Sequence, residues 1–425
     1  MKSVSFYGGL QLSGPRSPQP LTLETLPAPE TLIIPLLQHT GPACTPVVHK
    51  DDFVHQGDII AQNAQIAIIA PVSGYIEDTN HTCLAPQGSR TAAIRIANDG
   101  QDSLSPARDL SLKSMDKIFQ AGINDFSSRS LPLFTKLAQA QEKGIQSLII
   151  NGLDEATTCG GHSALCAAFA PDVLKGIQIL QELLRAEKVF IAVYAQAKQA
   201  VFALKQNIES ECIRLIPCRA KHPQHKEQLL ISVLLGQEYP PQIKPEDMGI
   251  TVLSAETAYA VAQCVVHNQP FVHKLLTIHG PAPGASRGVF VRLGTTLQDV
   301  IELLGQDEFK LGKVILGGPF TGQALFSLDV PVSKQTHALC LQTKDHIHRP
   351  RDKVCFKCGS CHQICPMRLM PFLISGFSES NNPELAQKHD IHCCIECGCC
   401  AYVCPAGIPL VQWIQMGKNA IAKTS

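Results

Sequence analysis

Cysteine spacing in the last quarter of the chain constrains this protein more than any other feature. Ten of the 18 cysteines lie between Cys355 and Cys404, and eight of them form the same run written twice. The runs are Cys355-Phe-Lys-Cys358-Gly-Ser-Cys361-His-Gln-Ile-Cys365-Pro366 and Cys394-Ile-Glu-Cys397-Gly-Cys-Cys400-Ala-Tyr-Val-Cys404-Pro405. Each reads C-x2-C-x2-C-x3-C-P, which is the bacterial spacing for a [4Fe–4S] cluster.

Two such runs predict two clusters that share their fourth ligands. A C-x2-C-x2-C loop wraps three thiolates around one cube, and the fourth cysteine of each run ligates the other cube. The predicted ligands are Cys355, Cys358, Cys361 and Cys404 for the first cluster, and Cys365, Cys394, Cys397 and Cys400 for the second. The two extra cysteines, Cys393 and Cys399, are expected to be free thiols beside the clusters.

Other uses of these cysteines fit the spacing poorly. A zinc site would use two more widely separated C-x2-C pairs, without a third cysteine in each run and without the Cys-Pro ending. A disulfide framework would indicate a small secreted chain, and the first residues resemble no signal peptide. Thiolate-bound clusters instead favour a reducing cytoplasm.

Composition excludes several classes of protein. Lysine plus arginine equals aspartate plus glutamate, 36 each, so a neutral chain is not expected to bind nucleic acid. No apolar run approaches the roughly 18 residues that span a bilayer. A chain of 425 residues has room for about three domains.

The first half of the chain predicts an extended lead-in followed by two domains. We expect a lead-in over residues 1–35, a barrel-sandwich hybrid over 36–110 and an α/β flavoprotein-like domain over 115–250. The sequence pattern of the hybrid domain is similar to that of lipoyl-carrier domains, which attach their prosthetic group to a lysine. No lysine occurs between Asp51 and Asn98, so this domain has no residue to carry such a group. In the α/β domain, strand-like and helix-like segments alternate, which favours a parallel sheet.

The second half predicts a smaller module and the cysteine-rich part. We expect a β-grasp (SLBB-like) module over residues 251–335, an α-helical double-cluster ferredoxin domain over 345–415 and a tail over 416–425. The run Gly317-Gly-Pro-Phe-Thr-Gly322 is expected to be a turn that closes a strand. His222 and His225 are expected in a solvated loop.

These segments, in this order, resemble the C subunit of the Rnf (Rsx) ion-translocating oxidoreductase of bacterial inner membranes. The resemblance covers nearly the whole chain. It includes Phe6-Tyr-Gly-Gly9, Pro35-Leu-Leu-Gln-His39, Leu148-Ile-Ile-Asn-Gly152, Thr257-Ala-Tyr-Ala-Val261 and Ile408-Pro-Leu-Val-Gln412. Because this family shares part of its fold with the flavin subunit of respiratory complex I, the resemblance implies an FMN and NADH site in the α/β domain.

The sequence departs from the family where that site would bind phosphate. The family's loop Gly-x-Gly-Gly-x-Gly-Phe-Pro aligns with Asp125-Phe-Ser127-Ser128-Arg-Ser130-Leu-Pro132, and its turn Asn-Gly-x-Glu-Cys-Glu-Pro aligns with Asn151-Gly-Leu-Asp154-Glu155-Ala-Thr157. Glycines let backbone N–H groups approach a phosphate closely, whereas each replacement adds a Cβ, and Asp125 adds a negative charge. The degenerate FMN loop therefore comprises Asp125, Ser127, Ser128, Ser130, Asp154 and Glu155.

Two interpretations of this loop stay open. The domain is a scaffold that has lost its ligand, or the pocket is remodelled so that Arg129 and Ser130 hold an anion through their side chains. In either case FMN is not expected to bind in the family's manner, and we do not expect independent NADH dehydrogenase activity.

The resemblance implies an electron-transfer subunit that relays electrons through two [4Fe–4S] clusters. It would lie peripherally on the cytoplasmic face of the inner membrane. Its partners would be the membrane and peripheral subunits of an Rnf/Rsx-type complex, with a soluble ferredoxin or NADH as redox partner. Alternatives are a non-enzymatic, cluster-bearing docking or assembly subunit and a cobalamin-reductase-like protein, although the latter would be expected to keep the glycine loop.

Overall fold

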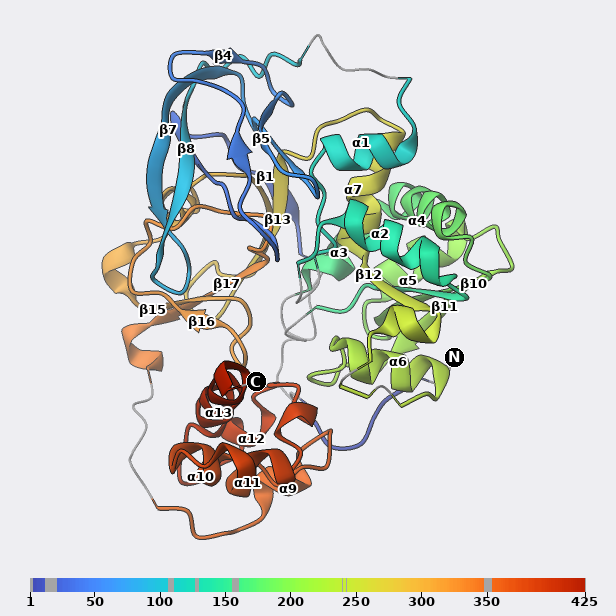
Figure 1. The fold of residues 1–425 in the computed structure, drawn as a ribbon, viewed down its shortest axis with the longest axis vertical. Coiled ribbons are helices and arrows are strands. Elements are labelled where there is room, and N and C mark those ends of the chain that lie inside the picture. The colour runs from blue at the N-terminus through green and yellow to red at the C-terminus, as the bar shows by residue number, and fades with distance from the viewer. Residues whose placement is uncertain are drawn as a thin grey trace.

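The protein is described by a computed structural model that covers residues 3–11, 21–105, 111–126, 130–154, 160–238, 240–241, 243–347 and 354–424. Figure 1 shows four parts. A β-rich domain (blue) and a mixed sheet (orange) lie on one side in this view, and a parallel-sheet domain (green) lies on the other. A helical part (red) lies below both.

The N-terminal domain contains two small antiparallel sheets around one apolar core, as predicted for a barrel-sandwich hybrid. Their strand orders are β2-β8-β7-β4 and β3-β5-β6. Along β8, Ile94 and Ile96 are buried while Arg95 between them is exposed, which is the period-2 pattern of a half-buried strand. The strands are β2 (Thr31–Pro35), β3 (Thr45–Pro46), β4 (Phe53–Val54), β5 (Ile59–Gln62), β6 (Ala67–Ile69), β7 (Gly74–Leu84) and β8 (Arg90–Asn98).

The range expected as an extended lead-in, residues 1–35, includes two strands that belong to sheets. Strand β2 belongs to the sandwich core, with Leu32 and Ile34 fully buried, and β1 (Leu23–Thr25) pairs with a strand of the mixed sheet. The physical reason is that half-buried and buried side chains alternate from Thr31 to Ile34, as in a strand with one face on the core. Strand β8 pairs with this segment along its whole length.

The middle domain is an α/β domain built on a four-stranded parallel sheet, as predicted. The sheet has the order β11-β10-β9-β12. In this order, β10 and β11 lie on one side of β9, and β12 lies on the other side. The carboxyl ends of β9 and β12 therefore flank a topological switch point, which is where sheets of this kind bind ligands. Its elements are α1 (Ser114–Gln120), α2 (Leu133–Lys143), β9 (Ser147–Asn151), α3 (Gly161–Ala168), α4 (Ala170–Leu184), β10 (Lys188–Tyr194), α5 (Lys198–Asn207), β11 (Ile213–Cys218), α6 (Glu227–Leu235), η1 (Pro245–Met248), β12 (Ile250–Ser254) and α7 (Ala255–Val265).

The boundary expected at residue 251 differs in the structure. Strand β12 pairs in parallel with β9 over its whole length, and α7 packs on α4, so the α/β domain extends to about Val265. Every residue of β12 is buried, and a strand buried on both faces requires the sheet neighbour and covering helices that only this domain provides.

The following part is a six-stranded mixed sheet with the order β1-β14-β13-β17-β15-β16. An antiparallel hairpin, a helix and a parallel return strand give it the arrangement typical of a β-grasp sheet. Its strands extend past the expected limit at residue 335, since β17 is central. The elements are β13 (His273–His279), β14 (Arg287–Arg292), α8 (Leu297–Leu303), η2 (Glu308–Lys310), β15 (Leu311–Leu316), β16 (Gln323–Ala324), β17 (Ala338–Thr343) and η3 (Lys344–His346). Residues 317–322 form the predicted turn, closed by the bond from Gly322 N to Gly318 O at 2.8 Å.

The described residues 354–424 contain helices and no strand. The expected tail from residue 416 is instead the second half of the last helix, where Ile421 is buried and the helix packs against α10. A 15-residue amphipathic helix buries more apolar surface than a loose tail would. The elements are α9 (Ser360–Gln363), α10 (Pro371–Glu379), α11 (Pro383–Lys388), η4 (Ile391–Cys393), α12 (Cys399–Tyr402) and α13 (Leu410–Thr424).

Residues 3–11 join the helical part to the parallel-sheet domain. Val4 forms a bridge beside Cys218 of β11, and Gly9 N donates to Ile364 O at 2.7 Å. Gly8 has φ +66°, and a Cβ on it would lie 2.7 Å from Ile364 O and 2.9 Å from Cys365 O. This position therefore needs glycine both for its backbone conformation and for its close approach to the first cysteine run.

Gly8→Ala is expected to detach residues 3–11 from the helical part. Gly100→Ala is the matched control, because Gly100 has φ +72° and open space around its Cβ position. In both variants, an alanine in the left-handed backbone conformation costs roughly 1–2 kcal/mol. Only Gly8→Ala also places a Cβ against the backbone of Ile364 and Cys365. Hydrogen exchange of residues 3–11 should accelerate at least tenfold in Gly8→Ala alone. If exchange in Gly8→Ala were no faster than in Gly100→Ala, the contact with Ile364 and Cys365 would not be what holds the segment.

In the part of the chain that the structure describes, no single helix is long and apolar enough to span a membrane. Helices α3 and α4 satisfy the length and composition requirement only together, and they are bent by 95° relative to one another.

Candidate functional site

The two cysteine runs have the same backbone conformation as well as the same spacing. The residue before the second cysteine is left-handed in both runs, with φ 56° at Lys357 and 53° at Glu396. The glycine after it is also left-handed, with φ 81° at Gly359 and 79° at Gly398, and each glycine precedes a four-residue helix. In the second run this conformation directs Glu396 N to Cys394 Sγ at 3.4 Å. The sequence repeat is therefore also a repeat in three dimensions.

Four cysteines from both runs meet on one side of the helical part. The thiol of Cys400 interacts electrostatically with the thiols of Cys394, Cys397 and Cys365. All four line one cavity, whose other walls are mainly apolar and include Met367, Ile374 and Val411. We call these four residues the inner quartet. They are the predicted ligands of the second cluster, and Cys365 reaches them from the other run.

The remaining predicted ligands form an outer quartet that is more exposed to solvent. Cys361 is buried and interacts with Cys355, while Cys404 of the second run packs against the apolar cluster that contains Cys361. Cys355 and Cys358 are both exposed. Cys358 Sγ lies 3.5 Å from Ser360 Oγ. The first run thus places Cys365 beside three cysteines of the second run, and the second run places Cys404 beside the cluster that contains Cys361.

The donor chemistry of both quartets fits an iron–sulfur cluster. Burial raises the pKa of Cys394 to about 12 and also raises the pKa of Cys365 and Cys361, so these thiols keep their protons until a cationic group displaces them. Among the described residues, no three His, Cys, Asp or Glu side chains form a group that could hold a single metal ion. A cubane separates its ligands, so the quartets need not converge on one point. Their role as ligands stays a prediction.

Cys399 and His222 both contact the inner quartet. The Cys399 thiol is fully buried, and its hydrogen bond lowers the pKa of Cys397. His222 Nε2 lies 2.6 Å from Cys397 O, and the ring packs on Phe320 with centroids 4.6 Å apart. The prediction of a solvated loop at His222 is therefore wrong, because the histidine is buried between the parallel-sheet domain and the second run. Cys393 is half-buried, and no disulfide is formed by the described cysteines.

Asp125 of the degenerate loop does not face an open phosphate site. Its side chain is fully buried, and Lys136 Nζ donates to Asp125 Oδ2 at 3.0 Å. Asp125 Oδ1 also accepts a bond from Leu131 N at 3.0 Å. Burial alone would lower the pKa of Lys136, but the charges of Asp125, Glu227 and Glu246 outweigh it and raise that pKa. The added negative charge thus neutralises a lysine of α2, which sequence reasoning did not anticipate.

Asp154 occupies the N-terminus of α3. Asp154 Oδ1 accepts a bond from His162 N at 2.8 Å, and the backbone N–H groups of Gly161 and Ser163 also bond to this carboxyl group. Burial raises the pKa of Asp154 above its ordinary value. Free N–H groups at a helix N-terminus are a common anion-binding device, and here the chain's own carboxyl group takes them.

Of the other residues of the degenerate loop, only Ser130 lies in the part of the chain that the structure describes. Ser130 is buried with φ 45°, and its Oγ accepts a bond from Asn124 Nδ2 at 3.0 Å. Ser127, Ser128, Arg129 and Glu155 lie outside the described residues. Of the described residues, Asp125 and Ser130 thus lie in one loop that packs on β12 through Lys136, and Asp154 lies after β9, the neighbouring strand.

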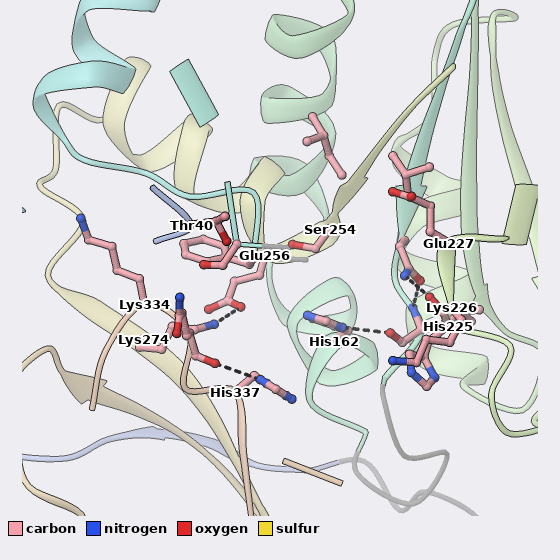
Figure 2. Close-up of a pocket in the computed structure, with 17 residues that line it drawn as sticks. Thr40, His162, His225, Lys226, Glu227, Ser254, Glu256, Lys274, Lys334 and His337 are labelled. Atoms are coloured by element: carbon pink, nitrogen blue, oxygen red, sulfur yellow. Dashed lines mark hydrogen bonds and ion pairs between the residues drawn. The ribbon is translucent and has the colours of Figure 1, made fainter. Parts of the chain in front are cut away.

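A pocket of about 290 Å³ opens at the carboxyl ends of β9 and β12. Figure 2 shows Lys274 and Glu256 facing one another on one side, and His225, Lys226 and Glu227 on the other, with His162 between them. Lys274 and Glu256 form a buried ion pair, and Lys274 Nζ lies 4.5 Å from the centre of the Phe126 ring. Sequence reasoning missed His162, Glu256 and Lys274. Their only signal is their place in the fold, since His162 and Glu256 are the second residues of α3 and α7 and Lys274 is the second residue of β13, and using it requires the strand order.

One wall of this pocket also contacts the inner quartet. His225 and Lys226 line the pocket, and His222, three residues earlier, bonds to Cys397. The rings of His222 and His225 are 5.6 Å apart, and the charge of Lys226 lowers the pKa of Cys397. The segment His222–Lys226 therefore lies between the pocket and the predicted second cluster and contacts both.

Two known families match parts of this chain. The family described as the RnfC barrel sandwich hybrid domain matches residues 4–101, and the Nuo51 FMN-binding domain matches residues 118–263. The second match agrees with the position of β12 inside the α/β domain.

Curated relatives match over most of the length. The C subunit of a proton-translocating ferredoxin:NAD(+) oxidoreductase complex from Clostridium ljungdahlii is 31% identical over 83% of this chain and 79% of the relative. The C subunit of the Na(+)-translocating complex from Acetobacterium woodii is 30% identical over 83% of this chain and 82% of the relative. The C subunit of an ion-translocating oxidoreductase complex from Pseudomonas aeruginosa is 31% identical over 98% of this chain, which spans 56% of that longer relative.

A solved structure shares the fold. The NAD+-reducing [NiFe]-hydrogenase in its H2-reduced state superposes with a TM-score of 0.50 at 14% identity, over 74% of this chain and 62% of the hydrogenase chain. At this identity the similarity concerns the fold alone.

Proposed function

Because this chain belongs to the family of C subunits of ion-translocating ferredoxin:NAD+ oxidoreductase complexes, we propose that it relays electrons through two [4Fe–4S] clusters in such a complex. When bound, the clusters supply one-electron redox chemistry. The observation that carries the proposal is the position of Cys365, which lies with Cys394, Cys397 and Cys400 although it belongs to the other run.

The chain's own residues hold and tune the two sites in different ways. The inner quartet is enclosed by apolar side chains and approached by Lys418, whose Nζ donates to Cys394 O at 2.6 Å. The outer quartet has two exposed thiols. Because hydrogen bonds, charge and solvent exposure set cluster potentials, the two clusters should differ in potential.

We further propose that this protein has lost the FMN and NADH site of its family. Three groups that could bind an anion are each occupied by a carboxyl group of the chain: Lys136 by Asp125, the N-terminus of α3 by Asp154, and Lys274 by Glu256. A phosphate that bound any of these three groups would have to displace a buried internal partner, which costs several kcal/mol. The pocket is retained, and these three groups are neutralised.

The partners follow from the family. We propose that the chain binds the membrane and peripheral subunits of an Rnf/Rsx-type complex on the cytoplasmic face of the inner membrane. With its own flavin site lost, electrons would enter the cysteine-rich part directly from another protein of the complex or from a soluble carrier such as a ferredoxin.

Anaerobic purification tests both proposals at once. We expect iron and acid-labile sulfide in the ratio of two [4Fe–4S] clusters, no stoichiometric FMN after acid extraction, and bleaching of the cluster absorbance by dithionite but not by NADH. Bound FMN together with NADH-driven bleaching would refute the loss of the flavin site. Zinc, or one cluster in place of two, would refute the relay.

A further inference from the structure

The two quartets differ in how the chain covers them. The inner quartet lies under residues 3–11, since Leu10 packs with Cys397 and the fully buried Cys399. His222 and Phe320 cover the same side. On the outer quartet, by contrast, the five consecutive residues Val354–Cys358 are all exposed. Only the outer quartet therefore presents cluster ligands directly to another molecule.

The exposed loop has an unusual composition for a surface. The Val354 side chain is 90% exposed and Phe356 is 64% exposed, although both are large and apolar. In the sequence, Phe356 and Lys357 lie between the two exposed cysteines Cys355 and Cys358. Exposed apolar side chains next to a functional group are typical of a protein–protein contact.

The charge around this loop is positive. No aspartate or glutamate occurs from Val354 to Ser378, whereas Lys357 and Arg368 are both exposed there. The chain as a whole is neutral, with 36 residues of each sign, so this stretch is a local excess. The sequence just before the loop adds Arg349, Arg351 and Lys353 against one acidic residue, Asp352. A positive excess of this kind orients a protein of opposite charge.

We propose that the loop Val354–Cys358 is the docking surface for an acidic electron-carrier protein, which exchanges electrons with the chain through the outer quartet. This proposal rests on the proposed function. The small area of the loop agrees with a transient encounter, because weak redox complexes bury less than about 1,200 Å². Phe356 and Val354 would supply the apolar contact, and Lys357 the orientation.

The test measures binding of an acidic bacterial 2[4Fe–4S] ferredoxin, used as the probe, to the anaerobically purified full chain by surface plasmon resonance. Lys357→Glu should weaken the Kd about tenfold at low ionic strength, and the difference should vanish at about 0.5 M salt, where charges are screened. Phe356→Ala should weaken the Kd several-fold at both salt concentrations. Lys50→Glu is the matched control and should leave the Kd within twofold. Lys50 is exposed just before β4, and Figure 1 shows β4 at the opposite end of the molecule from the helical part.

Reduction kinetics give a second readout. In stopped flow, one electron leaves the reduced ferredoxin and reduces one cluster of the chain. Lys357→Glu should slow this step about tenfold, while reduction by dithionite keeps its wild-type rate.

Three results would overturn the docking surface. They are an unchanged Kd in Lys357→Glu, an equal loss in Lys50→Glu, and Lys357-dependent binding to phosphatidylglycerol vesicles without binding of the ferredoxin. Each leaves a protein with two intact clusters and hence the proposed function untouched. A wild-type chain without clusters would instead refute the proposed function itself.

Discussion

Cys365→Ser should remove the same cluster as Cys397→Ser, although the two cysteines belong to different runs. Both lie in the inner quartet, where Cys365 interacts with Cys397. Iron and acid-labile sulfide should fall to half of the wild-type content in each variant, with loss of the same electron paramagnetic resonance signal. Cys404→Ser and Cys361→Ser should both remove the other signal, because these residues share the outer quartet.

Cys393→Ala and Cys399→Ala are the controls for this experiment. Neither cysteine is a predicted ligand, so both variants should keep the full iron content. Loss of the hydrogen bond from Cys399 to Cys397 should shift only the potential of the inner cluster. If Cys365→Ser removed the signal that Cys361→Ser removes, each run would ligate its own cluster and the exchange of fourth ligands would be wrong.

Lys136→Met should destabilise the α/β domain by about 3–5 kcal/mol, because it leaves the carboxylate of Asp125 buried and unpaired. The double variant Asp125→Asn with Lys136→Met should recover most of this loss, since no buried charge remains. Hydrogen exchange of β9 and β12, measured by mass spectrometry, reports the local stability. Because the pKa of Lys136 is raised above its ordinary value of 10.5, the stability that the charge of this lysine contributes is complete below that value and is lost as pH rises through the raised pKa.

Lys143→Met is the matched control for the buried pair. Lys143 is paired with Asp247, but both side chains are substantially exposed, and a surface ion pair contributes little to stability. Hydrogen exchange in this variant should stay close to wild type. If Lys136→Met were equally mild, or if it bound FMN as well as a functional relative does, Asp125 would not be the internal partner that replaces a ligand.

The proposed loss of the flavin site rests on anion-binding groups that the chain's own carboxyl groups occupy. Asp125 stands where the family pattern has a glycine and neutralises Lys136, whereas Asp154 stands where the pattern has a glutamate and accepts a bond from His162 N at the start of α3. A buried carboxylate without a partner is as costly to a fold as a buried, unpaired lysine. The domain contacts the second cysteine run through His222, and this contact uses only residues of the chain itself.

Local patterns in the sequence were sufficient for the regular elements. The alternation of strand-like and helix-like segments expected over residues 115–250 corresponds to β9, α4, β10, α5 and β11, and the three strands form the predicted parallel sheet. The C-x2-C-x2-C-x3-C-P runs predicted their own repeated loops. Each of these features depends on neighbours in the chain, through periodicity, glycine conformation or spacing, and so can be predicted without knowledge of the fold.

Contacts between distant segments decided the rest. Asp125 meets Lys136 because a turn folds the loop onto α2, and His222 reaches Cys397 across 175 residues of sequence. The difference between a covered inner quartet and an exposed outer one also depends on how residues 3–11 cross the helical part. The amino-acid sequence alone predicted which thiols bind iron, because ligand spacing is local. Which of them are buried, and which buried charges find a partner, was decided only by tertiary packing, because burial is a property of the whole fold.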